Sequence, residues 1–90
     1  MIELGGNIKL VNFEGLEPAL LIVVKKVVGN YTKKISESLN EFKSIEVTLV
    51  NKENNEIKVK VEANKSYESN AKDKNLFFAL DKCLSVILKE

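Results

Sequence analysis

The 90-residue chain contains no histidine, no tryptophan and no arginine, and it has one cysteine and one proline. Without histidine it lacks the most common general base, the most common zinc ligand and the side chain that titrates near neutral pH. Without arginine it lacks the planar donor fork that binds phosphate or carboxylate through two hydrogen bonds. These absences argue against an enzyme, and we expect neither a metal site nor a cofactor.

The single cysteine, Cys83, excludes an internal disulfide and with it the disulfide framework of small secreted domains. It lies near the apolar stripe of an expected helix, which predicts a small buried hydrophobe rather than a nucleophile. Residues 1–6 lack the basic-then-apolar order of a signal peptide. The longest apolar run, residues 19–24, is far shorter than the roughly 20 residues that span a bilayer. We therefore expect a cytoplasmic protein with no membrane partner.

The overall composition is that of a globular protein, with 44% hydrophobic and 30% charged residues. The length predicts a single domain over residues 1–90. Because the formal charge is only +1, the chain as a whole exerts no long-range attraction on nucleic acid or on an acidic membrane.

Hydrophobic periodicity predicts six secondary-structure elements. Alternation with period two indicates strands, most clearly in residues 56–63, whereas apolar spacings of three and four indicate helices. In the first helix this spacing continues from Leu20 to Phe42, and Asp73 is a candidate cap for the second. The expected elements are strand 8–13 (with 2–4 as a possible extension), helix 17–41, strands 44–50, 56–63 and 66–71, and helix 74–89.

The β-α-β-β-β-α order predicts an α+β fold in two layers. A strand–helix–strand unit places the first two strands parallel, and the short turns that follow make the later strands antiparallel. Each helix has one apolar stripe and each central strand one apolar face. We therefore expect a two-layer sandwich with both helices on one face of a four-stranded mixed sheet. The other face, with Glu46, Thr48, Lys58, Lys60 and Glu62, is expected to meet water.

Three segments carry a family resemblance. The hairpin IEVTLV (45–50) and IKVKVEAN (57–64) ends in an Ala–Asn turn, and the strand over residues 67–72 leads straight into a helix. That helix contains LFFALD (76–81). In these features the chain resembles the ribosome-hibernation factors, namely the bacterial hibernation-promoting factor and its ribosome-associated inhibitor relatives. The resemblance implies the two-layer fold and binding to RNA or the ribosome; residues 1–44 share only its topology.

The chain also departs from that family. The family carries an acidic pair where Lys74 and Asn75 open the second helix, and its ribosome-facing surfaces are rich in arginine and lysine. Here arginine is absent and glutamate alternates with lysine. The helix followed by β-β-β-α also resembles a double-stranded-RNA-binding domain. That domain's glycine-rich loop and Lys–Lys helix start are missing, so we rank it lower.

Two groups of lysines are candidate nucleic-acid contacts. Lys25, Lys26, Lys33 and Lys34 form a positive strip over two turns of the first helix, which could follow an RNA backbone. The alternative is an ordinary solvated helix face, partly balanced by glutamates one turn later. On the open sheet face, Lys58, Lys60 and Lys9 form the second group. Sheet surfaces that bind single-stranded nucleic acid also expose aromatic side chains that stack on the bases, and here only Phe13 could do so, if it turns outward. The ordinary explanation for these lysines is pairing with glutamates on neighbouring strands.

An apolar surplus lies on the outer sides of the expected helices. Ile22 and Val23 are roughly opposite the core stripe of the first helix, and Phe78 is opposite that of the second. Such residues indicate self-association as a homodimer, unless the N-terminal segment of the chain covers them. The leading hypothesis is thus a non-enzymatic module that binds structured RNA or the ribosome. The alternative is a homodimeric structural or interaction domain, and an enzyme ranks third.

Overall fold

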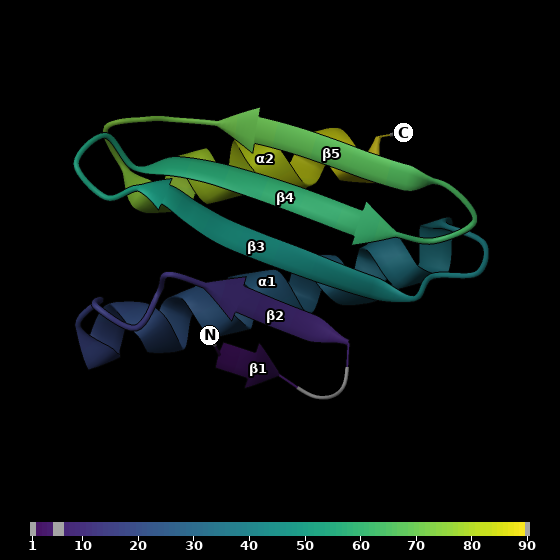
Figure 1. Ribbon diagram of the computed structural model, residues 1–90, viewed down its shortest axis with the longest axis horizontal. Coiled ribbons are helices and arrows are strands. Elements are labelled where there is room, and N and C mark those ends of the chain that lie inside the picture. Colours follow the sequence, from purple (N-terminus) through teal and green to yellow (C-terminus); the bar gives the residue numbers. More distant parts are fainter. Residues whose placement is uncertain (1, 5–6, 90) are drawn as a thin grey trace.

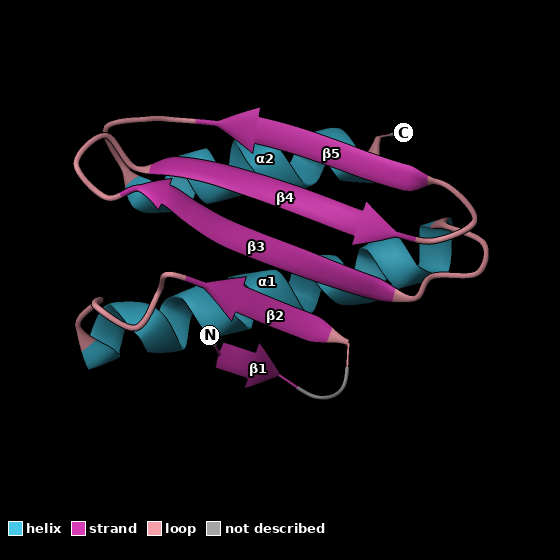
Figure 2. Ribbon diagram, viewed as in Figure 1, coloured by secondary structure: helices cyan, strands magenta, loops and turns pink. Residues whose placement is uncertain are grey.

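The computed structural model describes residues 2–4 and 7–89. It confirms the α+β fold predicted from the sequence, with a mixed sheet in one layer and two helices in the other (Figures 1 and 2). The elements are β1 (Ile2–Leu4), β2 (Ile8–Val11), α1 (Pro18–Ser38), β3 (Ser44–Asn51), β4 (Glu56–Glu62), β5 (Ser66–Ala71) and α2 (Leu76–Leu88).

The sheet follows the chain order β1-β2-β3-β4-β5. As expected, β2 and β3 are parallel neighbours joined through α1, and β3, β4 and β5 are antiparallel. These strand directions make the two helices parallel to each other. Both begin at the end of the molecule that holds the loop between β3 and β4 (Figure 1).

The sheet has five strands rather than the expected four. Residues 2–4 do not extend β2; they form β1, which pairs antiparallel with it in the register Ile2 to Leu10 and Leu4 to Ile8. This register places the side chains of Ile2 and Leu4 on the same face as those of Ile8 and Leu10. The hydrophobic core thereby gains a partly buried edge.

The core lies between the inner face of the sheet and the helices. Apolar and polar residues alternate along β3 and β4, and the apolar side chains point inward, where they are fully or almost fully buried. Cys83 on α2 is likewise buried, which confirms the expected small hydrophobe. The core side chains of the two strands are Ile45, Val47, Leu49, Ile57, Val59 and Val61.

Helix α1 begins at Pro18, whose missing N–H and fixed φ suit a first helical turn. Its most buried line runs through Val24, Val28, Thr32 and Ile35. The three-four spacing predicts Val24 and Ile35 correctly but expects Val27 and Tyr31 in place of Val28 and Thr32. The difference arises because α1 packs on two neighbours, the sheet and α2. The expected Tyr31 belongs to the flank that faces α2, which leaves Thr32 facing the core.

Phe13, a candidate for an outward aromatic, is instead completely buried. The cause is Asn12, whose φ of 68° places it in the left-handed region directly after β2. Asparagine tolerates this conformation better than most residues. The turn breaks the strand alternation, so Phe13 enters the core and the open sheet face has no stacking platform at this position.

Candidate nucleic-acid interface

The lysines of α1 lie on the side of the helix that faces away from the sheet. Lys26, Lys33 and Lys34 are exposed, whereas Lys25 is half-buried on one flank. At about 100° per residue, Lys26 and Lys33 point almost directly away from the buried line of the helix. The seven positions between them correspond to about 10 Å along the axis. Lys26, Lys33 and Lys34 are therefore exposed to solvent, with Lys25 at the margin of this group.

No ion pair among the described residues neutralises the charge of the strip. Among residues 2–4 and 7–89, the described ion pairs involve Lys58, Lys60 and Lys82, and none includes a lysine of α1. Glu37, which follows Lys33 by about one turn, is exposed on the same side of the helix. The face is thus positive in its middle and becomes acidic towards its C-terminal end.

Lys34 differs from the other lysines of the strip because it lies above an aromatic ring. Its Nζ is 5.7 Å from the centroid of the Tyr31 ring. The hydroxyl of Tyr31 in turn donates a hydrogen bond to the Oδ1 atom of Asp81 on α2. This bond raises the pKa of Tyr31 above its ordinary value, since the phenol must keep its proton to donate. Lys34 is thereby placed over the junction between the helices.

The open face of the sheet has a different charge pattern. Its strand registers place five charged residues directly opposite one another across all five strands, with alternating sign. Opposite charges at facing positions stabilise a sheet and cancel each other's field. The row runs Glu3, Lys9, Glu46, Lys60, Glu68.

Ion pairs neutralise two of the three lysines in this second group. Lys58 Nζ is 3.6 Å from Glu68 Oε1, and Lys60 Nζ is 3.9 Å from Glu62 Oε1. Both pairs are about half exposed, so each contributes little to stability. The ordinary explanation given for Lys58 and Lys60, pairing with glutamate, is therefore correct, and α1 remains the better candidate interface.

The exposed apolar residues lie on the outer side of the helix layer, as expected. Ile22 is 66% exposed, Val23 is 43% exposed and Phe78 is 63% exposed. Ile22 shares the outward face of α1 with Lys26, whereas Val23 turns toward α2. None of the three is covered by the N-terminal segment described here. Val86 on α2, at 47% exposed, was not singled out from the sequence.

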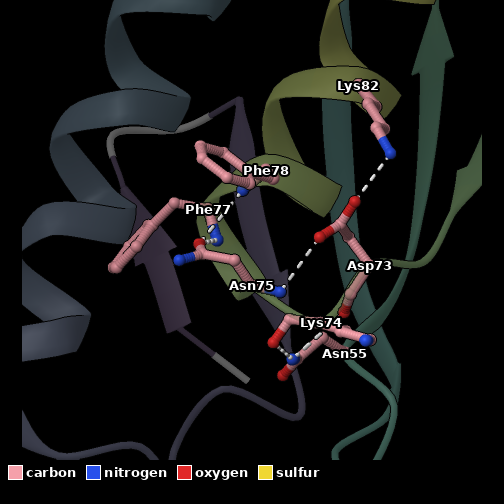
Figure 3. Close-up of polar contacts among 7 residues, drawn as sticks. All are labelled: Asn55, Asp73, Lys74, Asn75, Phe77, Phe78 and Lys82. Carbon is pink, nitrogen blue, oxygen red and sulfur yellow. Dashed lines mark hydrogen bonds and ion pairs between the residues drawn. The ribbon is translucent and has the colours of Figure 1, made fainter.

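A cluster of polar contacts surrounds the start of α2 (Figure 3). The prediction that Asp73 caps α2 is wrong, because Asn75 is the cap. The side-chain oxygen of Asn75 accepts hydrogen bonds from the backbone N–H groups of Phe77 and Phe78 at 2.8 and 3.3 Å. Asp73 instead accepts from the backbone N–H of Asn75 at 3.1 Å and pairs with Lys82 at 2.6 Å. The hydrogen bond from Lys82 lowers the pKa of Asp73.

Two open hollows lie at this end of the molecule. One, of about 430 Å³, is lined by residues of the β3–β4 loop and the β5–α2 loop, including Glu53, Lys72 and Asp73. The other, of about 350 Å³, lies between the first turns of the two helices and is lined in part by Leu20 and Phe77. The loops are joined by Asn55, whose side-chain amide donates to the carbonyls of Asp73 and Lys74 at 3.2 and 2.9 Å (Figure 3).

Cys83 donates to the carbonyl of Ile57 at 3.6 Å, and burial raises the pKa of its thiol, which disfavours the thiolate. Within the described part of the chain, no three side chains of the metal-binding types His, Cys, Asp and Glu gather closely enough to hold a metal ion. Neither described helix is both long and apolar enough to cross a membrane.

Comparison with known proteins gives matches among solved structures. No protein-family model matches the sequence, and no curated protein matches it either. A solved structure titled as a ribosomal subunit interface protein from Coxiella burnetii matches with a TM-score of 0.60 at 14% sequence identity. The match covers 92% of this chain and 88% of the other. It confirms, at the level of the fold, the resemblance that the hairpin and the second helix suggested. The chain therefore has the fold of a ribosomal subunit interface protein.

Proposed function

We propose that this chain is a small non-enzymatic binding module that associates with the ribosome in the cytoplasm. The contact is made with structured RNA through Lys26, Lys33 and Lys34 on α1, with Lys25 at the margin. The observation that carries the proposal is the set of α1 lysines that form no ion pair with any described residue, on a fold shared with a ribosomal subunit interface protein. The sheet face, where charges alternate, offers no comparable attraction.

The physical basis is the contact between lysine and phosphate. Each lysine that neutralises a phosphate releases condensed counterions, which makes affinity fall steeply with salt. Such contacts require only correctly placed positive charge and read no base sequence, so they suit a rigid helix face. Specificity for the ribosome then rests on the shape of its RNA, because single-charge lysine ammonium groups do not form the bidentate contacts of arginine.

The test is co-sedimentation with purified ribosomal subunits over a series of salt concentrations. The variant Lys26→Gln with Lys33→Gln removes two charges from the strip, and Lys58→Gln with Lys60→Gln removes two from the sheet face as a matched control. We expect the strip variant to lose about tenfold in affinity and the slope of log affinity against log salt to fall by about 1.5. The control should retain both values. Equal effects of the two variants, or no binding at low salt, would refute the proposal.

Self-association through the outer side of the helix layer is the second candidate. The exposed Ile22, Val23 and Phe78 favour it, since large apolar side chains grouped on one surface are common at interfaces. A symmetric pairing of α1 with its copy would bring the positive strips together, which is why we place this candidate second. Sedimentation velocity should show a dimer that Ile22→Lys dissociates; a dimer that this change leaves intact speaks against this surface.

A further inference from the structure

The strand β5 leaves one edge of the sheet open. It is the last strand in the sheet order, and it is six residues long, whereas β1 at the opposite edge has three. Natural sheets protect such edges with lysine, proline, bulges or very short strands. Residues 66–71 contain no lysine and no proline, and Glu68 is their one charge. The β4–β5 pairing is continuous from Ser66 to Ala71, without a register shift.

The helix beneath this edge exposes an apolar side chain on the same side. Asp81 marks the flank of α2 that faces α1, because it accepts the hydrogen bond of Tyr31. At about 100° per residue, Val86 lies on the opposite flank, which faces the β5 edge. Val86 is 47% exposed. The open strand and the exposed valine thus form one surface, which we call the β5 edge surface.

We propose that two copies of this chain pair through the β5 edge surface, with β5 antiparallel to β5 of the second copy. The two sheets of five strands become one continuous sheet of ten, and both helix layers remain on the same face. Backbone hydrogen bonds of the open edge supply the attraction, and a two-fold axis relates the copies.

The side chains of β5 select the register of this pairing. In an antiparallel pair of strands, two residues that lie directly opposite each other point to the same face of the sheet. The two-fold axis must therefore lie between one residue of β5 and the same residue of the second copy. An axis at Glu68 sets Glu68 against Glu68 of the second copy, which is unfavourable. An axis at Ser69 sets Glu68 against Asn70 of the second copy, and Tyr67 against Ala71. This register uses nearly the whole strand and creates no pair of like charges.

The position of α2 fits the same arrangement. Cys83 contacts both neighbouring strands, since it donates to Ile57 on β4 and approaches Ser69 on β5. A helix midway between two strands about 4.8 Å apart would lie about 10 Å from its copy across the axis. Packed helices have this separation, so Val86 can become buried between them. Lys82, near the same flank, is already paired with Asp73.

The β5 edge surface does not overlap the α1 strip, so the inference is independent of the proposed ribosome contact. Asn70 is exposed and lies opposite Glu68 of the second copy, which makes it the best position for a test. Asn70→Glu and Asn70→Lys both remove the hydrogen bond from Asn70 to Glu56, so they differ only in the sign of the added charge.

Sedimentation equilibrium between about 1 and 200 μM measures the dimer, since association depends on protein concentration. We expect Asn70→Glu to weaken the dimer by about tenfold and Asn70→Lys to strengthen it by a similar factor, because each acts at two symmetric positions. Adding Glu68→Lys to Asn70→Glu should restore association, and Val86→Lys should weaken it. A monomer throughout, the same shift for both Asn70 variants, or dissociation by Ile22→Lys alone would overturn the proposal.

Discussion

The hydroxyl of Tyr31 donates a hydrogen bond to the carboxylate of Asp81, 50 positions later in the chain, and this bond joins the facing flanks of α1 and α2. Lys34 lies above the same ring. The two helices have no direct connection through the chain, since three strands intervene. The Tyr31–Asp81 bond therefore helps to fix where the lysines of α1 stand relative to α2.

Removing this hydrogen bond should loosen the helix pair without unfolding the domain. We expect Tyr31→Phe to lower the free energy of unfolding by about 0.5–1 kcal/mol, at the low end for a charged acceptor because water screens it. Asp81→Asn keeps an acceptor and should lose less. Urea denaturation of both single variants and the double variant measures the coupling. Additive losses would show that the bond contributes nothing.

The same pair makes stability depend on pH in the alkaline range. The hydrogen bond to Asp81 raises the pKa of Tyr31, so the folded state holds the phenol proton more tightly than the unfolded state, whose value is about 10. This contribution is complete below that value and is lost as pH rises through the folded-state pKa. The difference in the free energy of unfolding between the parent chain and Tyr31→Phe should therefore become smaller at high pH. Denaturation measured over the alkaline pH range tests this, and a difference in the free energy of unfolding that does not change with pH contradicts the prediction.

The hydroxyl of Thr32 is buried and has no hydrogen-bond partner among the described residues. An unsatisfied buried hydroxyl costs free energy, and valine has nearly the same shape without that cost. Thr32→Val should therefore raise the free energy of unfolding by about 1 kcal/mol. Thr32→Ser, which keeps the hydroxyl and removes a methyl group, should lower it. Thermal denaturation distinguishes the two, and a destabilised valine variant would show that the hydroxyl has a partner.

The side chain of Asn75 satisfies two backbone N–H groups at the start of α2. Asn75→Ala leaves both without this acceptor and should cost about 1 kcal/mol of stability. Asn75→Asp preserves the acceptor and adds a favourable charge at the helix N-terminus, so it should cost little or nothing. Chemical denaturation of the two variants provides the comparison. Equal losses would mean that another group caps the helix.

The Asp73–Lys82 pair predicts a measurable effect at acidic pH. Because the hydrogen bond from Lys82 lowers the pKa of Asp73, the folded state favours the carboxylate relative to the unfolded state, whose value is about 3.9. The contribution is present above that value and is lost as pH falls through the folded-state pKa. Lys82→Gln should raise the pKa of Asp73, measured by NMR titration of its carboxyl carbon. An unchanged midpoint would show that the backbone N–H of Asn75 dominates.

Local pattern was sufficient for the main architecture. The alternation in residues 56–63 specifies both a strand and its buried face. The three-four spacing after Leu20 specifies a helix, but Val28 and Thr32 on its buried line differ from the predicted stripe. The separate strand β1 was harder to predict, because three residues carry too little alternation to distinguish an extension from a new strand. Phe13 was misjudged because the left-handed turn at Asn12 reverses the face, and nothing in the alternation signals that turn.

The candidate interface was only partly predictable. Helical geometry was enough to place Lys26 and Lys33 on the outer face of α1. The pairing of Tyr31 with Asp81 depends on how two helices pack, and the cluster around Asp73 depends on where two loops meet. Likewise, the alternating row on the sheet requires the register between the parallel strands β2 and β3, which no turn length fixes.

The parallel course of α1 and α2 has an electrostatic consequence. In an antiparallel helix pair the two macrodipoles oppose each other, whereas here they add. Their positive ends coincide beside the β3–β4 loop (Figure 1). Lysines and acids both line the hollows at this end, namely Lys52, Lys72 and Lys74 with Glu53 and Asp73. The backbones of the two helices thus contribute a dipole along the length of a molecule whose formal net charge is only +1, and the field of this dipole points the shared helix start towards an anionic surface.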